Sequence, residues 1–166
     1  MIEMKVAGIA IDAVNRSPIV LLKDSTDRRA LPIYINQDQA KAIIGALENQ
    51  KPPRPLTHDL IVNTLEVWNM VLERVVIHSI QEGTFYAILT VRQGEVKKEI
   101  DARPSDAIAI ALRTNSPIWV MEEVVADASI PVDRDADLAE REAFREFISS
   151  LSPDQLIKKG GYREQH

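Results

Sequence analysis

The sequence predicts an α+β fold in which a β3-α2 unit occurs twice. The two units are expected to form one curved, barrel-like mixed sheet with helices outside, followed by a C-terminal helical tail. Three observations support this prediction. Strand-like runs come in groups and do not alternate with helices, the same order of elements begins again after about 67 residues, and residues 127–166 change to an acidic, helix-like pattern.

The first unit begins with three short apolar runs at residues 5–12, 19–22 and 30–35. Turn-forming residues separate them at 15–18 and 24–27, so the runs are predicted to form a three-stranded meander. A helix is predicted from about residue 37 to residue 49, and prolines at 52, 53 and 55 end it. A second helix then follows, with Thr57 predicted as its N-cap.

The second unit repeats this order, with strands predicted at residues 72–80, 84–91 and 96–102 and a helix at 104–113. The apolar segment 118–125 is predicted to be a final strand or a short helical stretch. An offset of 67 residues places Leu22 on Leu89, Ile33 on Ile100 and Ala40 on Ala107 without a gap. We therefore predict a duplication with repeats at about 4–70 and 71–126. Because one meander buries its apolar face poorly alone, the two copies are expected to share one sheet within a single domain, 1–126.

Residues 127–166 are predicted to be an acidic connector followed by a helical tail. The connector contains four aspartates and the predicted helix carries an apolar stripe that needs a partner surface. An exposed stripe of this kind, together with short edge strands, predicts a homo-oligomer. The aspartates are Asp127, Asp133, Asp135 and Asp137, and the stripe consists of Leu138, Phe144, Phe147, Ile148 and Leu151.

Composition limits the classes of protein to consider. The net charge is −5, of which residues 1–126 carry only −2, and no run of Lys or Arg marks a strong nucleic-acid footprint. This counts against tight, non-specific binding by a monomer but leaves open a local basic groove or one formed between subunits. The chain has no cysteine, no signal-peptide pattern and no apolar stretch long enough to span a membrane. A soluble, cytoplasmic protein without membrane contacts is expected.

The most unusual polar segment is residues 101–106, where a predicted strand gives way to an almost wholly apolar helix. Backbone N–H groups and the dipole at a helix start favour an anion. Arg103 is suited to clamp a phosphate, and Asp101 with Asp106 is suited to hold a magnesium ion. The structural alternative is that Ser105 or Asp101 caps the helix and that Arg103 pairs with a nearby carboxylate.

A second polar segment, residues 54–59, also stands at a predicted helix start. His58 beside Asp59 offers a general base or a metal ligand. The alternative is that Thr57 caps the helix, Asp59 complements the dipole and His58 lies in solvent. The common signatures of phosphate-binding glycine loops, nucleophile elbows and paired-histidine zinc helices are missing from the sequence.

These two segments and residues 83–87 resemble the bifunctional nuclease domain family. The matching strings are Arg-Pro-Leu-Thr-His-Asp-Leu at 54–60, Gly-Thr-Phe-Tyr-Ala at 83–87 and Asp-Ala-Arg-Pro-Ser-Asp-Ala-Ile-Ala at 101–109. The resemblance spans about residues 4–126 and implies a duplicated β3-α2 unit with activity on DNA and RNA. The chain departs from it at Trp68–Asn69–Met70, where relatives often have a leucine-glycine turn.

The resemblance and the chemistry of the motif residues together give a set of candidate roles. The catalytic candidates are His58, Asp59, Asp101 and Asp106, and the phosphate-binding candidates are Arg54, Arg103 and Ser105. Asp101 and Asp106, with Asp59 as a further candidate, would hold a divalent ion, Mg²⁺ or Mn²⁺. These roles require the two predicted helix starts to converge in space.

Two hypotheses follow. The first is a metal-dependent nuclease that hydrolyses phosphodiester bonds in DNA or RNA with little sequence preference. The second is a non-enzymatic, oligomeric binding or regulatory module whose polar motifs stabilise the fold or a subunit interface. Near-neutral charge and the missing signatures favour the second hypothesis, and the resemblance favours the first.

Overall fold

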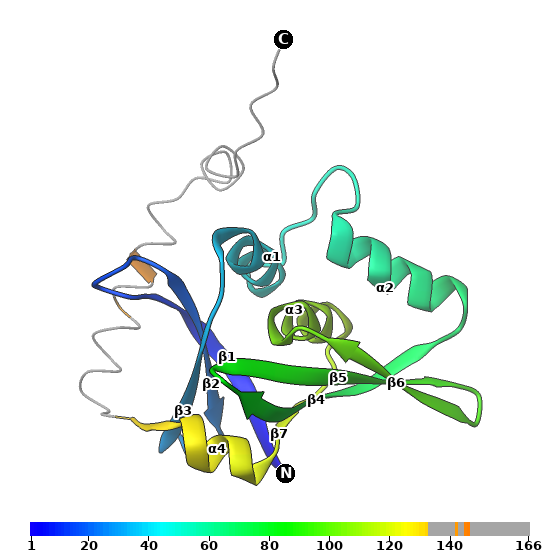
Figure 1. The fold of residues 1–166 in the computed structure, drawn as a ribbon. Helices are drawn as coiled ribbons and strands as arrows, with labels where there is room; N and C mark the ends of the chain where they lie inside the picture. Colours follow the sequence, from blue (N-terminus) through cyan, green and yellow to red (C-terminus); the bar gives the residue numbers. More distant parts are fainter. Residues whose placement is uncertain (133–141, 143–144, 147–166) are drawn as a thin grey trace.

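The computed structural model describes residues 1–132, 142 and 145–146, and these form one mixed sheet of eight strands with four helices (Figure 1). Strands β1 (Ile2–Ile11), β2 (Pro18–Asp24) and β3 (Arg29–Tyr34) make an antiparallel meander. Strands β4 (Val71–Gln81), β5 (Thr84–Gln93) and β6 (Val96–Ala102) make a second one. The predicted α+β class and both meanders are therefore confirmed.

A short strand joins the two meanders. β7 (Ile118–Val120) pairs antiparallel with β1 and parallel with β4, so the strand order is β6-β5-β4-β7-β1-β2-β3-β8. β8 (Ile130–Pro131) pairs with the outer side of β3. Within the described residues β6 and β8 each have one neighbour only, so the sheet is open. The predicted barrel-like curvature of the sheet stays a prediction.

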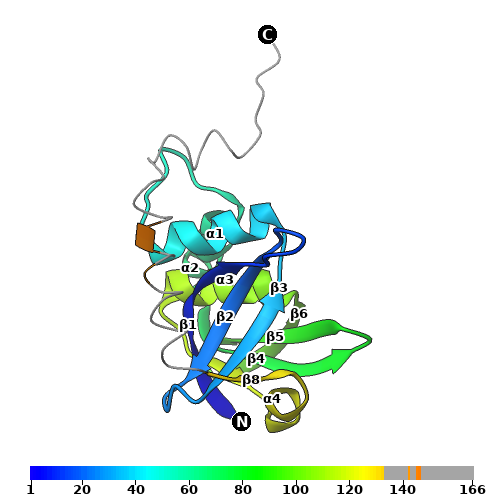
Figure 2. The ribbon, with the colours of Figure 1, turned by 90° about the vertical axis from the view of Figure 1, so that its left-hand side faces the viewer.

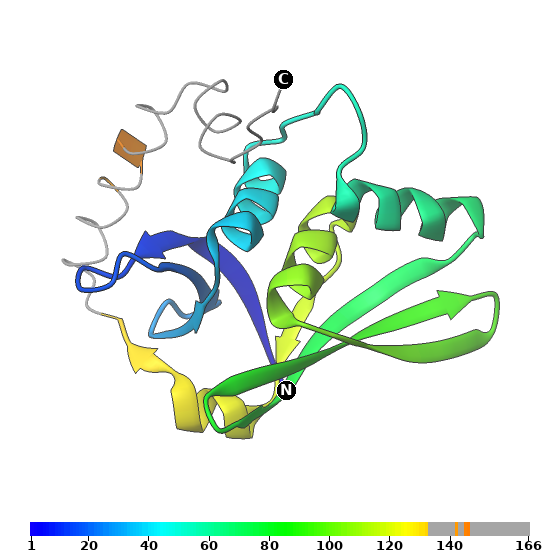
Figure 3. The ribbon, with the colours of Figure 1, turned by 45° about the horizontal axis from the view of Figure 1, so that its top comes forward.

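Three helices lie together beside the sheet and a fourth packs at its opposite end (Figure 2). They are α1 (Gln37–Leu47), α2 (Thr57–Val67), α3 (Pro104–Thr114) and α4 (Glu122–Ala128). α3 is the central helix, because the five residues at 107–111 are at most 2% exposed. Small alanines alternate there with isoleucines, which lets α1, α2 and the sheet approach α3 from different sides (Figure 3).

Several details of the structure agree with the 67-residue offset. Both bounds of α1 and α3 differ by 67 residues, and Asp27 and Gly94, which the offset aligns, both have positive φ at their turns. A common origin of the two halves stays a prediction that these coincidences support.

The predicted helix caps are wrong. Thr57 is the first residue of α2 and its N-cap is Leu56, while the N-cap of α3 is Arg103 and not Ser105 or Asp101. Neither cap residue uses its side chain. In α3 the reason is that Pro104 occupies the first helical position, where its missing N–H costs nothing and its fixed φ starts the helix.

The predicted domain boundary lies in the region after β7. Segment 118–125 contains both alternatives, strand β7 and the first half of α4. The boundary expected between residues 126 and 127 falls inside α4, whose Val124 and Val125 are buried in the core. The predicted apolar stripe from Leu138 to Leu151 and the aspartates at 133, 135 and 137 lie outside the described residues. Among the described helices, none has both the length and the apolar character required to span a membrane.

Candidate active site

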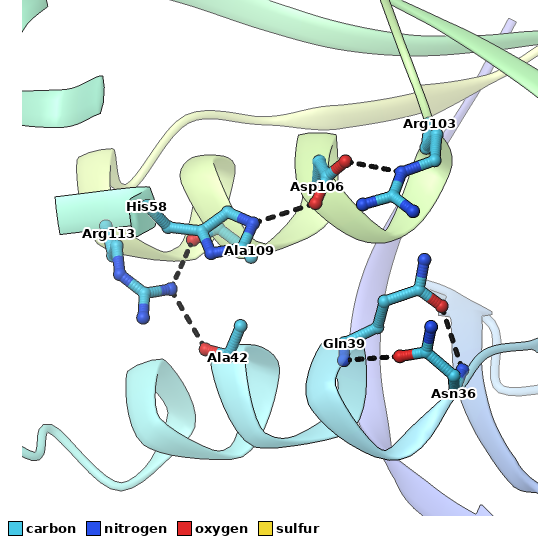
Figure 4. Close-up of polar contacts among 8 residues, drawn as sticks. All are labelled: Asn36, Gln39, Ala42, His58, Arg103, Asp106, Ala109 and Arg113. Atoms are coloured by element: carbon cyan, nitrogen blue, oxygen red, sulfur yellow. Dashed lines mark hydrogen bonds and ion pairs between the residues drawn. The ribbon is translucent and has the colours of Figure 1, made fainter. Parts of the chain in front are cut away.

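The starts of α2 and α3 meet at a histidine–aspartate pair. His58, the second residue of α2, has its Nε2 atom 2.8 Å from Oδ1 of Asp106, the third residue of α3 (Figure 4). An ionised carboxylate only accepts hydrogen bonds, so Nε2 carries the proton and a neutral His58 has its lone pair on Nδ1. The convergence that the catalytic hypothesis required is present for these two residues, and His58 is neither solvated nor alone.

Arg103 completes a three-residue cluster, which we call the His58–Asp106–Arg103 cluster. Nε of Arg103 donates to Oδ2 of Asp106 at 2.7 Å, as the structural alternative had expected. The Arg103 side chain is 66% exposed, and only its Nε has a partner within the part of the chain that the structure describes. Its two terminal nitrogens therefore remain available to an anion such as a phosphate.

The surroundings keep Asp106 ionised. Burial alone would raise the pKa of its carboxyl, but the hydrogen bonds from Arg103 and His58 outweigh burial and hold that pKa below its ordinary value. The same contact raises the pKa of Arg103. The cluster is thus an Arg–Asp ion pair against which the histidine ring is oriented.

A second contact ties α2 to the far end of α3. Nε of Arg113 donates to Oδ1 of Asp59 at 2.9 Å, and its Nη1 donates to the carbonyl oxygens of Ala42 and Ala109, each at 2.9 Å. Oδ2 of Asp59 accepts from the N–H of Leu56. Burial raises the pKa of Asp59, but these hydrogen bonds outweigh it and lower the pKa overall. Both oxygens of Asp59 are therefore used inside the fold, and its predicted catalytic role stays a prediction.

Sequence reasoning missed Arg113, although one side chain links α1, α2 and α3. Its only signal in the sequence is a basic residue in the last turn of a helix, which the helix dipole explains without any tertiary contact.

Within the part of the chain that the structure describes, no hydrogen bond or ion pair joins the remaining candidates to the cluster. Asp101 is opposite Ile88 on β5, so its side chain lies on the sheet face that points away from the buried Leu89 and α3. Ser105 is 4% exposed in the first turn of α3, which favours packing over phosphate contact. Arg54 is exposed in the loop before α2 and has no hydrogen bond or ion pair within the described residues.

The donor set does not form a ready metal site. Among the described residues, no group of three or more His, Cys, Asp or Glu side chains is placed to hold a metal ion. Oδ1 of Asp106 already accepts from His58 and Oδ2 from Arg103, so a metal would share each oxygen with a hydrogen-bond donor. The Asp101–Asp106 metal pair stays a prediction.

The helix starts add a favourable field for an anion. α1 and α3 run side by side with their N-termini at the same end, and Figure 4 shows Asn36 and Gln39 at the start of α1 on the side of Arg103. Asn36 and Gln39 form a capping box with two 2.8 Å hydrogen bonds. The dipoles of α1 and α3 favour an anion at this end of the helix pair, and a phosphate site there stays a prediction.

Comparison with known proteins matches this chain to one family model. The bifunctional nuclease domain model matches residues 20–133. Uncharacterized proteins from two strains of Mycobacterium tuberculosis are each 44% identical over 162 residues, covering 93% of this chain and 97% of theirs. Bifunctional nuclease 1 of rice (Oryza sativa subsp. indica) is 26% identical over 124 residues, covering 73% of this chain but only 38% of the rice protein.

Proposed function

Because this chain belongs to the bifunctional nuclease domain family, we propose that it hydrolyses phosphodiester bonds in DNA or RNA at the start of α3. The observation that carries the proposal is the 2.8 Å contact between His58 and Asp106, with Arg103 on the other oxygen of the same carboxylate. A family relative from rice is named a bifunctional nuclease, which supports this reaction class.

The cluster supplies the parts that a phosphodiesterase needs. Asp106 is the positioning residue, since it fixes the His58 ring and leaves Nδ1 as the basic atom. His58 then takes a proton from the attacking water, a contribution of roughly 10²–10⁴ in rate. The water oxygen bonds to phosphorus while the P–O bond to the leaving nucleotide breaks, and the leaving oxygen takes a proton from solvent. The terminal nitrogens of Arg103 bind the phosphate oxygens and stabilise the charge that develops on them.

Little sequence preference is expected because the proposed contacts go to phosphate. Arg103 and the exposed Arg54 both match phosphate oxygens, which carry no base information. Phosphate contacts by arginine also imply that binding weakens as salt rises. A requirement for Mg²⁺ or Mn²⁺ is the part of the proposal that the donor set supports least, so the test must include each ion and a chelator.

The decisive experiment is cleavage of plasmid DNA and single-stranded RNA by the full chain. Wild type, His58→Ala and Asp106→Asn are compared at matched purity with Mg²⁺, with Mn²⁺ and with EDTA. His58→Ala is expected to lower the cleavage rate by about 10²–10⁴ and Asp106→Asn by about 10-fold or more. His78→Ala is the matched control, since His78 lies on β4 outside the cluster and is expected to leave the rate unchanged.

Each outcome is informative when thermal unfolding is followed in parallel. Wild-type cleavage that both cluster variants retain would assign the activity to a contaminant or to another site. Cleavage lost by His58→Ala in a protein that still unfolds cooperatively would support the proposal. Activity that persists in EDTA would remove the metal requirement and leave the His58 chemistry in place.

The non-enzymatic alternative also has a specific observation in its favour. Both oxygens of Asp106 and both oxygens of Asp59 are already bonded within the protein. These contacts are sufficient to hold α2 on α3 without any reaction. In this second candidate function, the family domain is a binding module. The wild-type protein then cleaves no substrate, and the cluster variants have a lower unfolding temperature than the wild type.

The predicted homo-oligomer has a candidate surface on α2. No residue of α2 is buried, and Leu60, Val67 and Trp68 are 59%, 78% and 60% exposed. We expect Trp68→Asp to shift the sedimentation coefficient of the full chain toward that of a monomer. Val14→Asp is the control, because Val14 is 95% exposed but lies away from α2 in the β1–β2 loop. A wild type that sediments as a monomer would contradict the prediction.

A further inference from the structure

A pocket of about 510 Å³ lies on the sheet face that points away from α3. It is lined by side chains from β4, β5, β6 and β7, namely Arg74, Thr90, Glu99 and Trp119 among others. These residues alternate with Val75, Leu89 and Val120, which are buried in the core on the other face. The pocket is therefore separated from the His58–Asp106–Arg103 cluster by the thickness of the sheet.

One wall of this pocket contains an unpaired buried hydroxyl. Thr90 is 6% exposed, and its Oγ1 has no hydrogen-bond partner within the described part of the chain. A buried hydroxyl without a partner costs about 1–3 kcal/mol, so native proteins normally satisfy it with protein, water or ligand. Because Thr90 lines the pocket while its Oγ1 has almost no accessible surface, a polar atom of a bound molecule supplies the missing partner only after the Thr90 side chain rotates.

The charges around the pocket indicate what that molecule carries. Glu73 is bonded to Arg92 and Lys97 at 2.8 and 3.0 Å, and these hydrogen bonds, led by that from Lys97, lower its pKa. Arg74 and Glu99, by contrast, have no hydrogen bond or ion pair within residues 1–132. An unpaired guanidinium accommodates a phosphate, and an unpaired carboxylate accepts hydrogen bonds from hydroxyl or amino groups.

Trp119 adds an aromatic surface to the same wall. Its neighbours Ile118 and Val120 are buried at 5% and 0% exposure, so the indole is held on a rigid strand with only partial exposure. An indole in a pocket stacks on planar rings, and base–aromatic stacking contributes about 1–3 kcal/mol. The volume lies within the roughly 300–1,000 Å³ range of small-molecule sites.

We propose that this pocket binds a nucleoside monophosphate. The base stacks on Trp119, the phosphate pairs with Arg74, and a polar atom of the ligand satisfies Thr90 Oγ1 while Glu99 accepts from a hydroxyl or amino group. The site is on the opposite face from the proposed catalytic cluster, so the proposal stands without the nuclease activity. A nucleoside monophosphate also has no phosphodiester bond to cleave, so its binding is measured separately from hydrolysis.

The chain offers a direct optical test. It contains two tryptophans, and Trp68, the C-cap residue of α2, is 60% exposed. The Trp68→Phe variant of the full chain therefore makes Trp119 the only tryptophan. AMP is the probe, with adenosine and ribose 5-phosphate as the partial ligands. We expect AMP to quench the fluorescence of Trp119 saturably. Adenosine, which lacks the phosphate, is expected to bind about 10-fold or more weakly than AMP.

Variants in the same background identify the contacts. Arg74→Ala is expected to raise the Kd for AMP about 10-fold or more and to leave the Kd for adenosine unchanged. Thr90→Val, which keeps the shape and removes the hydroxyl, is expected to weaken both ligands several-fold without lowering the unfolding temperature. Thr90→Ser restores the hydroxyl and should restore binding. Ser79→Ala is the control, because Ser79 Oγ is also buried and unpartnered but does not line the pocket.

Three results would overturn the proposal. One is that AMP, at concentrations up to the millimolar range, does not saturably quench the Trp119 fluorescence of the folded protein. Another is equal affinity for AMP and adenosine, which would remove the phosphate contact. The third is unchanged affinity in both Arg74→Ala and Thr90→Val, which would place the ligand elsewhere.

Discussion

Asp106 is the central residue of the candidate site, because its carboxylate contacts the side chains of both Arg103 and His58. Arg103 is on the chain segment just before α3, three residues away, whereas His58 is 48 residues away on α2. The local contact follows from helix geometry, since residues three apart are neighbours. The distant one depends on how α2 crosses α3. For this reason the residue types and the pairing of Arg103 with a nearby carboxylate were predictable from the two motifs, and the contact of His58 with Asp106 was not.

The ionisation of Asp106 gives a prediction at the residue scale. Its folded-state pKa is lowered, so the carboxylate contributes stability above its unfolded pKa of about 3.8, and the contribution is lost as pH falls through the folded value. Asp106→Asn is therefore expected to cost about 1–3 kcal/mol at pH 7 and progressively less below about pH 4. Urea unfolding of both proteins from pH 7 to pH 3 measures the difference.

The control for this measurement is Asp101→Asn. Asp101 is exposed on β6 and makes no hydrogen bond or ion pair within the described residues, so its replacement should change the unfolding free energy at pH 7 by no more than about 0.5 kcal/mol. A cost of Asp106→Asn that stays constant from pH 7 to pH 3 would show that the ionised form of Asp106 gains nothing from Arg103 and His58.

At the scale of elements, the apolar pattern of α3 was sufficient to predict where the helix begins and ends in the sequence. The helix predicted at 104–113 is observed at Pro104–Thr114, because a proline at the first position and an apolar run mark its extent. The pattern gave no information on its neighbours. An almost wholly apolar helix is compatible with contacts on every side, and α3 indeed packs against α1, α2 and the sheet.

The link made by Arg113 gives a prediction for this helix layer. Its side chain is 12% exposed and bonds Asp59 on α2, a carbonyl on α1 and a carbonyl on α3. Arg113→Ala removes the donor to Oδ1 of the Asp59 carboxylate and one donor to each of two carbonyl groups, so we expect a loss of about 3–5 kcal/mol, measured by denaturant unfolding. Arg113→Lys keeps the charge but not the planar fork and should recover only part of that loss.

Arg113 also separates structural from catalytic effects. Because it lies at the far end of α3 from Arg103, a folded Arg113→Lys protein is expected to retain most of the wild-type cleavage rate while His58→Ala loses it. Equal losses of cleavage in Arg113→Lys and His58→Ala would mean that both act through the packing of α2 on α3.

At the scale of the whole molecule, the sequence predicted the two meanders but not their junction. β7 has only three residues, and its pairing with β4 is parallel, which requires a crossover through α3. A three-residue apolar segment next to a helical one has no periodicity that separates strand from helix. The open order of the eight strands therefore became clear only from the structure, whereas the α+β class followed from element order.

The end of the domain gives the last prediction. A protein ending at residue 126 would lose the last turn of α4, including Ala128, which packs against the core, and the β8 pairing at Ile130–Pro131 with β3. The Ser129 N–H to Val125 carbonyl bond would go with them. Because Val124 and Val125 depend on this turn, we expect the 1–126 protein to be less stable than the 1–132 protein by about 2 kcal/mol, measured by thermal and urea unfolding.

Two substitutions in the full chain test, without truncation, whether the last turn of α4 stabilises the domain. Ala128→Asp places a charge against the core and should lower the unfolding temperature, since an unpaired charge is costly to bury. Asp127→Ala changes the exposed neighbour on the same turn and should not. Equal stability of the 1–126 and 1–132 proteins would instead support the boundary predicted from the sequence, because α4 would then hold its two valines in the core without its final turn or the β8 pair.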